Sequence, residues 1–173
     1  MIVATDVLYD EEQHTGLAAA VAFGGWGDEV AQREWTHLVQ DIEPYVPGSF
    51  YKRELPCLLA LLAPVLEQLS VVLVDGHAWL AADRPGLGHH LWEALDQQIP
   101  VIGVAKARFY GGYAQEVLRG RSKKPLYVTA AGMDPASAVV HLLQMHGPYR
   151  VPTLLKRVDK LTRQRVEAAG SSP

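Results

Sequence analysis

The first forty residues contain three apolar stretches separated by short segments rich in polar residues or glycine. Apolar runs bounded by turn-forming residues are typical of β-strands joined by tight connections. We expect strands over Ile2–Tyr9, Leu17–Gly24 and Val30–Leu38. The connections at Asp10–Gly16 and Gly24–Asp28 are short, so the three strands are predicted to form an antiparallel meander.

Beyond residue 50 the pattern changes to an alternation of helices and strands. From Arg53 to Leu69 the apolar residues recur every three to four positions, as on one face of a helix. The remaining expected elements are strands over Val71–Asp75, Val101–Ala105 and Leu126–Thr129, and helices over Gly86–Gln97, from Asp134-Pro135 to about Met145, and from Thr153 to about Arg165. This order is that of the ribonuclease H-like fold, an α/β class in which a mixed sheet of three antiparallel strands and then parallel strands is flanked by helices.

The length and composition indicate one globular domain. The chain has 173 residues, of which 49% are hydrophobic, and we expect the domain to span residues 1–165 with a flexible tail over 166–173. The single cysteine, Cys57, excludes an intrachain disulfide and a thiolate metal cluster. The apolar runs are too short to span a bilayer, and the first residues do not resemble a signal peptide. We therefore expect a cytoplasmic monomer with no membrane partner.

Charge is distributed unevenly along the chain. The formal net charge is −3, but residues 1–99 contain 4 Lys/Arg and 15 Asp/Glu, whereas residues 100–173 contain 12 Lys/Arg and 4 Asp/Glu. An acidic half suited to a cation beside a basic half suited to phosphates favours a nuclease. Ordinary variation of surface charge is the alternative interpretation.

Three carboxylates stand in otherwise apolar surroundings. Asp6 interrupts the first strand, Asp75 ends the strand at residues 71–75, and Glu54 lies at the start of the first helix. Each also has a purely structural explanation. Asp6 could be an outward-facing strand residue, Asp75 part of a turn, and Glu54 an acid favoured by the dipole in the first turn of a helix. If they converge, their repulsion requires a cation, and oxygen ligands select Mg²⁺ or Mn²⁺. Lys106, at the end of the next predicted strand, is then placed to stabilise charge on a phosphate, or is simply a surface lysine.

The segment Pro44–Gly48 is predicted to be a stiff loop. Its two prolines restrict the backbone, and Gly48 permits a tight turn or a close approach. A rigid loop that carries Tyr45 could wedge between stacked bases. Alternatively, Tyr45 packs against the protein and the loop is only rigid.

Six segments, in order, resemble motifs of the endonuclease V family. Pro44–Gly48 followed by Arg53–Pro56 resembles PYIPG…FRE-P, and Val74–His77 resembles VDGHG. The other similar segments are Gly86–Leu91 (GLASHLG), Ile99–Lys106 (IPTIGVAK), Lys124–Thr129 (KPVYVS) and Arg150–Asp159 (RLPEPIR-AD). The resemblance covers nearly the whole chain, from Ile2 to about Arg163.

The resemblance implies a ribonuclease H-like DNA-repair nuclease. Such an enzyme uses Mg²⁺, or Mn²⁺ as a substitute, and cleaves DNA on the 3′ side of deoxyinosine, one nucleotide beyond the lesion; some relatives act on inosine in RNA. The implied catalytic residues are Asp6, Glu54, Asp75 and Lys106, and the implied metal ligands are Asp6, Glu54, Asp75 and Asp159. The implied substrate-binding residues are Tyr45 and Pro47 in a strand-separating wedge, and Gly48, Phe50, Gly76, Leu87 and Phe109 around a flipped base.

One segment departs from the family pattern. After His77 the family has glycine, an apolar residue, alanine, histidine, proline and arginine, whereas residues 78–84 read AWLAADR. Ala78 replaces a pocket glycine, so its methyl is expected to narrow the space for the base, and Ala81 replaces a histidine, for which His77 or the pair His89-His90 are candidate substitutes. Two alternatives therefore stay open: a nucleic-acid-binding relative that has lost cleavage, and a nuclease of altered specificity.

Overall fold

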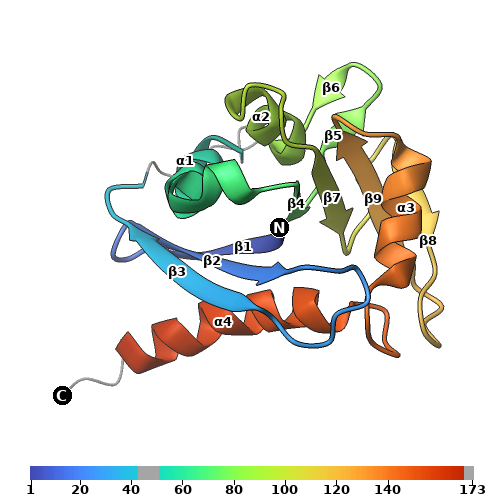
Figure 1. Cartoon of the computed structure of the whole chain (residues 1–173). Coiled ribbons are helices and arrows are strands. Elements are labelled where there is room, and N and C mark those ends of the chain that lie inside the picture. The colour runs from blue at the N-terminus through green and yellow to red at the C-terminus, as the bar shows by residue number, and fades with distance from the viewer. Residues whose placement is uncertain (43–50, 170–173) are drawn as a thin grey trace.

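A central β-sheet with helices on both faces forms the protein (Figure 1). The structure, a computed structural model, describes residues 1–42 and 51–169, with side chains to Gln164. The elements, in chain order, are β1 (Ile2–Asp10), β2 (Thr15–Phe23), β3 (Arg33–Val39), α1 (Tyr51–Leu62), the 3₁₀ helix η1 (Ala63–Gln68), β4 (Val71–Asp75), β5 (Trp79–Ala81), β6 (Arg84–Pro85), α2 (Leu87–Ala94), β7 (Val101–Ala105), β8 (Gln115–Val117), β9 (Leu126–Ala131), α3 (Pro135–Gln144) and α4 (Thr153–Ala169).

The main sheet has seven strands in the order β3-β2-β1-β4-β7-β9-β8. The first three strands form the predicted antiparallel meander, and β4 and β7 continue the sheet parallel to β1. This arrangement confirms the predicted fold class. One pairing differs from the prediction: β9, which was expected to continue the sheet as a parallel strand, runs antiparallel to β7. A parallel pair needs a crossover connection, usually a helix, whereas residues 106–125 contain the short strand β8 instead.

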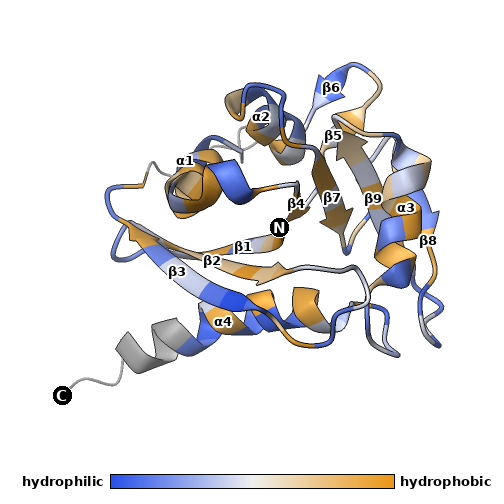
Figure 2. Ribbon diagram, in the orientation of Figure 1, coloured by the Kyte–Doolittle hydropathy of each residue, from blue (hydrophilic) through white to orange (hydrophobic). Residues whose placement is uncertain are grey.

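Two hydrophobic cores lie on opposite faces of the sheet. The alternation of side chains along β1 sends Val3 to the face covered by α1 and α2, and sends Ile2 and Ala4 to the face covered by α3 and α4. In β2, small side chains at residues 18–20 and 22 are fully buried, which lets helices pack closely on both faces. Figure 2 shows apolar residues concentrated in the central strands, whereas the edge strand β3 is largely polar.

Several boundaries differ from the sequence prediction for local physical reasons. β3 begins at Arg33 rather than Val30, because the preceding turn is held by Asp28, whose carboxylate accepts hydrogen bonds from the Gly24 and Gly25 amides at 3.0 Å. The predicted helix over residues 53–69 divides into α1 and η1, with Pro64 in the first turn of η1. The predicted helices at residues 135–145 and from 153 are confirmed, although α4 extends to Ala169.

Three short strands were not expected from the sequence. The hairpin β5–β6 lies within the segment that departs from the family pattern, and β8 forms the edge of the main sheet. The connection from β4 to β5 passes directly over β7 at Gly103. A Cβ atom at Gly103 would lie 2.4 Å from the Ala78 amide nitrogen and 2.7 Å from the Gly76 carbonyl oxygen. Only glycine therefore permits this close approach, which holds residues 76–78 against the middle of β7.

None of the helices within the described ranges is long and apolar enough to cross a membrane.

Candidate functional site

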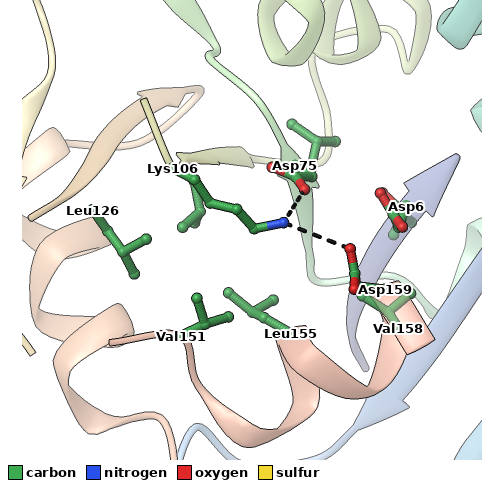
Figure 3. Close-up of a pocket in the computed structure, with 11 residues that line it drawn as sticks. Asp6, Asp75, Lys106, Leu126, Val151, Leu155, Val158 and Asp159 are labelled. Carbon is green, nitrogen blue, oxygen red and sulfur yellow. Dashed lines mark hydrogen bonds and ion pairs between the residues drawn. The ribbon is translucent and has the colours of Figure 1, made fainter. Parts of the chain in front are cut away.

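The carboxylates identified in the sequence converge at one end of the central strands. Asp6 lies in β1 and Asp75 at the carboxyl end of the neighbouring parallel strand β4, while Glu54 comes from the first turn of α1. Asp6 and Asp75 line a small recess together with Lys106 and Asp159, and a second small recess together with Glu54. Figure 3 shows Asp6, Asp75 and Asp159 around the side chain of Lys106, contributed by β1, β4 and α4. The structure therefore brings all five residues to one place.

Lys106 is held between two of the carboxylates. Its Nζ atom donates a hydrogen bond of 2.7 Å to Asp75 Oδ2 and lies 3.7 Å from Asp159 Oδ1 (Figure 3). Partial burial acts to lower the pKa of Lys106, but the hydrogen bond and charge of Asp75 and the charge of Asp159 outweigh burial and raise it. The ammonium group thus stays protonated and fixed beside the acids.

Asp159 extends the cluster from the opposite helix layer. It lies in α4, and Arg163, one turn later, is 3.2 Å from its Oδ1 atom. The hydrogen bond from Arg163, and then the charge of Lys106, lower the pKa of Asp159 despite partial burial. Asp159 is therefore ionised at neutral pH.

Thr162 is a site residue that sequence reasoning missed. Its side chain is buried, and its hydroxyl lies 3.1 Å from Asp6 Oδ2 and 2.8 Å from the Asp159 carbonyl oxygen. The hydroxyl thereby links α4 to β1 at the carboxylate cluster and orients Asp6. A threonine three positions after an aspartate carries no distinctive sequence signal, so this contact could be found only from the packing of α4.

Burial and mutual repulsion perturb two of the acids. Burial and then the charge of Asp75 raise the pKa of Asp6 to about 6. Burial and then the charges of Asp6 and Asp75 raise the pKa of Glu54 to about 8. The Glu54 Oε2 atom is also buried and lacks a hydrogen-bond partner among the described residues. Carboxylates that repel one another around an unsatisfied buried oxygen are suited to a divalent cation, and an all-oxygen donor set with an adjacent ammonium fits Mg²⁺ or Mn²⁺.

The raised pKa of Glu54 leads to a prediction about stability. Because the folded protein binds the Glu54 proton more tightly than the unfolded chain, ionisation of Glu54 destabilises the fold progressively as pH rises from about 4.5 towards 8. We expect Glu54→Gln to raise the free energy of unfolding of the metal-free protein by about 2–4 kcal/mol at pH 9, and to change it little below pH 4.5. Urea unfolding in EDTA across this pH range measures the effect.

The control for this experiment is Glu67→Gln, which changes an exposed glutamate in η1. It should leave both the stability and its pH dependence within about 0.5 kcal/mol of the wild type. If wild type and Glu54→Gln lose stability equally between pH 5 and pH 9, repulsion at Glu54 is not the cause of that loss.

A larger cavity adjoins the carboxylates. It has a volume of about 380 Å³ and shares Glu54 and Asp75 with the acidic cluster. Three residues predicted to surround a base line it: Gly76, Leu87 and Phe109. His77, a candidate replacement for the family's histidine, also lines it, and the lining residues that the sequence did not single out are Tyr51, Leu80, Arg84, Pro85 and Gly86. The predicted substrate-binding residues Tyr45, Pro47, Gly48 and Phe50 lie outside the described residues.

The expected effect of Ala78 on this cavity is wrong. Ala78 is fully buried, its amide donates a 2.7 Å hydrogen bond to Thr129 Oγ1, and its side chain faces Gly88 of α2 rather than the cavity. His77 does line the cavity, and its Nε2 lies 3.2 Å from the Ala107 carbonyl oxygen. His89 and His90 are not among the cavity residues, so of the candidate replacements for the missing histidine only His77 is placed there.

Comparison with known proteins identifies relatives along most of the chain. The family model described as endonuclease V matches residues 1–132, a range that includes Asp6, Glu54, Asp75 and Lys106 but not Asp159. Endonuclease V of Streptomyces avermitilis is 31% identical over 189 aligned residues, which cover 97% of this chain and 81% of the relative.

Solved structures agree with the sequence comparison. The crystal structure of endonuclease V from Streptomyces avermitilis superposes with a TM-score of 0.77 at 28% identity, covering 98% of this chain and 82% of the other. Endonuclease V of Ciona intestinalis, crystallised with a 24mer DNA containing an inosine followed by a ribo-adenosine, gives a TM-score of 0.80 at 18% identity, covering 97% of this chain and 86% of the other. At 18% identity, the similarity to the Ciona intestinalis protein shows that the two chains share a fold.

Proposed function

This chain belongs to the endonuclease V family of nucleases, and we propose that it cleaves a nucleic-acid strand on the 3′ side of a deaminated base, deoxyinosine or inosine, with Mg²⁺ as cofactor and Mn²⁺ as a substitute. The observation that carries this proposal is the junction of two features: a carboxylate–lysine cluster, and a cavity that shares Glu54 and Asp75 with it. A base held in the cavity would place its own backbone beside the cluster. The inosine-containing DNA bound to the Ciona intestinalis relative supports this substrate.

The acidic residues would hold the cation. Asp6, Glu54 and Asp75 supply oxygen ligands from three elements, and Asp159 supplies a fourth carboxylate from α4. When bound, the ion supplies positive charge that lowers the pKa of a water molecule and offsets charge on the phosphodiester. Glu54, whose pKa is raised to about 8 in the metal-free protein, would lose its proton when the ion binds, whereas Asp6, with a pKa of about 6, is already largely ionised at neutral pH.

Lys106 would act on the same phosphodiester as a fixed cation. Its ammonium group lies within contact of Asp75 and Asp159, so it remains charged and oriented. Hydrolysis adds water across the bond between phosphorus and the 3′ oxygen, which leaves a 5′-phosphate and a 3′-hydroxyl. The ammonium would stabilise the extra negative charge that develops on the phosphate oxygens.

The cavity would hold the base outside the helix stack. Phe109 and Leu87 offer apolar faces against which a purine ring can pack, and the Arg84 guanidinium carbon lies 5.2 Å from the Phe109 ring centroid. Gly76 has φ of 144°, and the space where a Cβ would stand is open. The Gly76 amide donates a hydrogen bond to the Val104 carbonyl oxygen, so this glycine would provide room for the base rather than a free donor. A cavity of a few hundred Å³ is also the usual size for a small-molecule site.

Cleavage of defined oligonucleotides tests this proposal. Single- and double-stranded substrates with one inosine would be labelled and compared with strands carrying adenine at that position, in Mg²⁺ and in EDTA. We expect metal-dependent cleavage one nucleotide 3′ of the inosine, a 5′-phosphate on the released fragment, and an intact adenine strand. Equal cleavage of both strands would contradict the base pocket, and tight binding without cleavage would identify a nucleic-acid-binding protein instead.

A further inference from the structure

A second group of metal-ligating side chains lies on α2, outside the carboxylate site. His89, His90 and Glu93 each place a ligand atom so that the three atoms lie within 4.8 Å of one another. The Nδ1 atoms of His89 and His90 are 3.4 Å and 3.6 Å from Glu93 Oε2. Ligand atoms around a tetrahedral Zn²⁺, with bonds of about 2.0–2.2 Å, are separated by about 3.3–3.5 Å. The two histidine–glutamate distances in the free protein are thus close to those of a bound site, and the two imidazole ligand atoms lie within 4.8 Å of each other.

We propose that His89, His90 and Glu93 form a binding site for a transition-metal ion of the Zn²⁺ class. The two imidazole Nδ1 atoms and one carboxylate oxygen would be the protein ligands, and Glu93, whose side chain is half exposed, leaves the fourth position accessible to water or an exogenous ligand. The site is chemically distinct from the all-oxygen cluster, because imidazole nitrogen favours Zn²⁺, Ni²⁺ and Cu²⁺ over Mg²⁺.

An unsatisfied nitrogen in His89 supports the site. His89 Nδ1 is buried and makes no hydrogen bond within the described part of the chain, although Glu93 is near. A buried nitrogen lone pair without a partner is unfavourable, and an ion between it and the carboxylate would satisfy both.

Aromatic neighbours hold the two histidine rings in position. The Trp79 ring, from β5, packs edge-to-face on the His89 ring, with the two centroids 4.0 Å apart. The Trp92 ring also packs edge-to-face on His89, with centroids 5.6 Å apart. Tyr51 of α1 stacks on His90 at 3.7 Å with an interplanar angle of 19°. Because the rings are already packed, ion binding would require little further ordering, which favours affinity.

Ion binding here would influence the neighbouring cavity. The histidines follow Leu87 on α2, and both Leu87 and Tyr51 line the cavity. An ion bound to α2 would therefore restrict the motion of the first turn of α2 and of Tyr51, which stacks on His90, and both border the cavity. Because the unfolded chain cannot present this geometry, the ion should also stabilise the folded protein.

Zn²⁺ binding by the full-length protein tests the proposal. Titration in excess Mg²⁺, which saturates the carboxylate cluster, should show one bound Zn²⁺ equivalent and a rise in melting temperature. Glu93→Gln and His89→Ala should lose that equivalent. Glu93 is half exposed, so its substitution should leave the fold intact even if His89→Ala does not fold. Asp75→Asn should retain the Zn²⁺, which keeps this result separate from failure of the nuclease proposal.

His141→Ala is the matched control. His141 also lies on a helix, α3, and stacks on a tryptophan, Trp26, at 4.3 Å, but it is not part of the cluster. The His141→Ala protein should bind one Zn²⁺ as the wild type does. If Glu93→Gln and His89→Ala bind as much Zn²⁺ as the wild type, or if His141→Ala loses as much as they do, the site does not exist.

Tryptophan fluorescence gives an independent readout. Ni²⁺ or Cu²⁺ bound to His89 would lie next to Trp79 and should quench its emission. The quenching should saturate with one ion, fall markedly in Trp79→Phe and disappear in Glu93→Gln. Quenching of equal size in the wild type and Glu93→Gln would place the ion elsewhere and overturn the proposal.

Discussion

Replacing Asp75 by asparagine should lower the rate of cleavage of an inosine-containing strand by about 10³-fold, since metal-assisted charge stabilisation contributes several kcal/mol to such a reaction. Asp75 is the residue that lines both small recesses and the base-sized cavity, and it also accepts the 2.7 Å hydrogen bond from Lys106. Its loss therefore removes a proposed metal ligand and the partner that orients the lysine. Single-turnover cleavage in saturating Mg²⁺ measures the effect.

Strand binding should survive this substitution, because removal of a negative charge does not weaken contact with phosphates. Fluorescence anisotropy in EDTA would measure binding separately from cleavage. Asp83→Asn is the matched control: Asp83 is exposed, lies eight residues further on, and is absent from the cavity lining. Its cleavage rate should match the wild type. Cleavage by Asp75→Asn within tenfold of the wild type would remove Asp75 from the proposed mechanism.

Arg119 should have the largest effect on stability outside the carboxylate cluster. It follows β8, is buried, and donates hydrogen bonds to carbonyl oxygens of the connection between α3 and α4, including Tyr149 at 2.9 Å and Met145. Arg119→Ala would leave the buried Met145 carbonyl and several partly buried carbonyl groups without their donor, so we expect the free energy of unfolding to fall by about 3–5 kcal/mol. Urea unfolding in EDTA at neutral pH measures the change.

Two variants show whether the carbonyl contacts are the cause. Arg119→Lys keeps the charge and some donors and should recover part of the stability. Arg121→Ala removes an exposed arginine two residues later and should change stability by no more than about 0.5 kcal/mol. A loss under about 1 kcal/mol in Arg119→Ala would mean that water or other groups satisfy these carbonyls. Because α4 carries Asp159, we also expect Arg119→Ala to weaken Mg²⁺ binding.

The local elements followed closely from the sequence because hydrophobic spacing and capping act over a few residues. The apolar runs of the first three strands, the switch of period near Arg53, and the Asp134-Pro135 helix start are all local features. The acids were visible for the same reason: Asp6 and Asp75 interrupt or end strands whose other residues are apolar. That they share one site required the parallel pairing of β1 and β4.

Features that depend on residues distant in the chain could not be predicted this way. The antiparallel direction of β9 results from the path of residues 106–125, which no periodicity specifies. The methyl of Ala78 faces α2 rather than the cavity because the chain crosses Gly103 at close range. A motif comparison aligns Ala78 with a pocket position, but only the crossing determines where its side chain points.

The chemistry of the site also divides into features that the local sequence indicates and features that only the tertiary structure determines. Residue types and order made Asp6, Glu54, Asp75 and Lys106 candidate site residues, and the motif resemblance added Asp159, because motifs preserve identity and spacing. The raised pKa values of Asp6 and Glu54 and the contact between Asp6 and Thr162, 156 positions apart, arise only when helices cover both faces of the sheet. Burial and distance between charges are properties of the packed molecule, and long-range packing of side chains has no local signature in the order of residues.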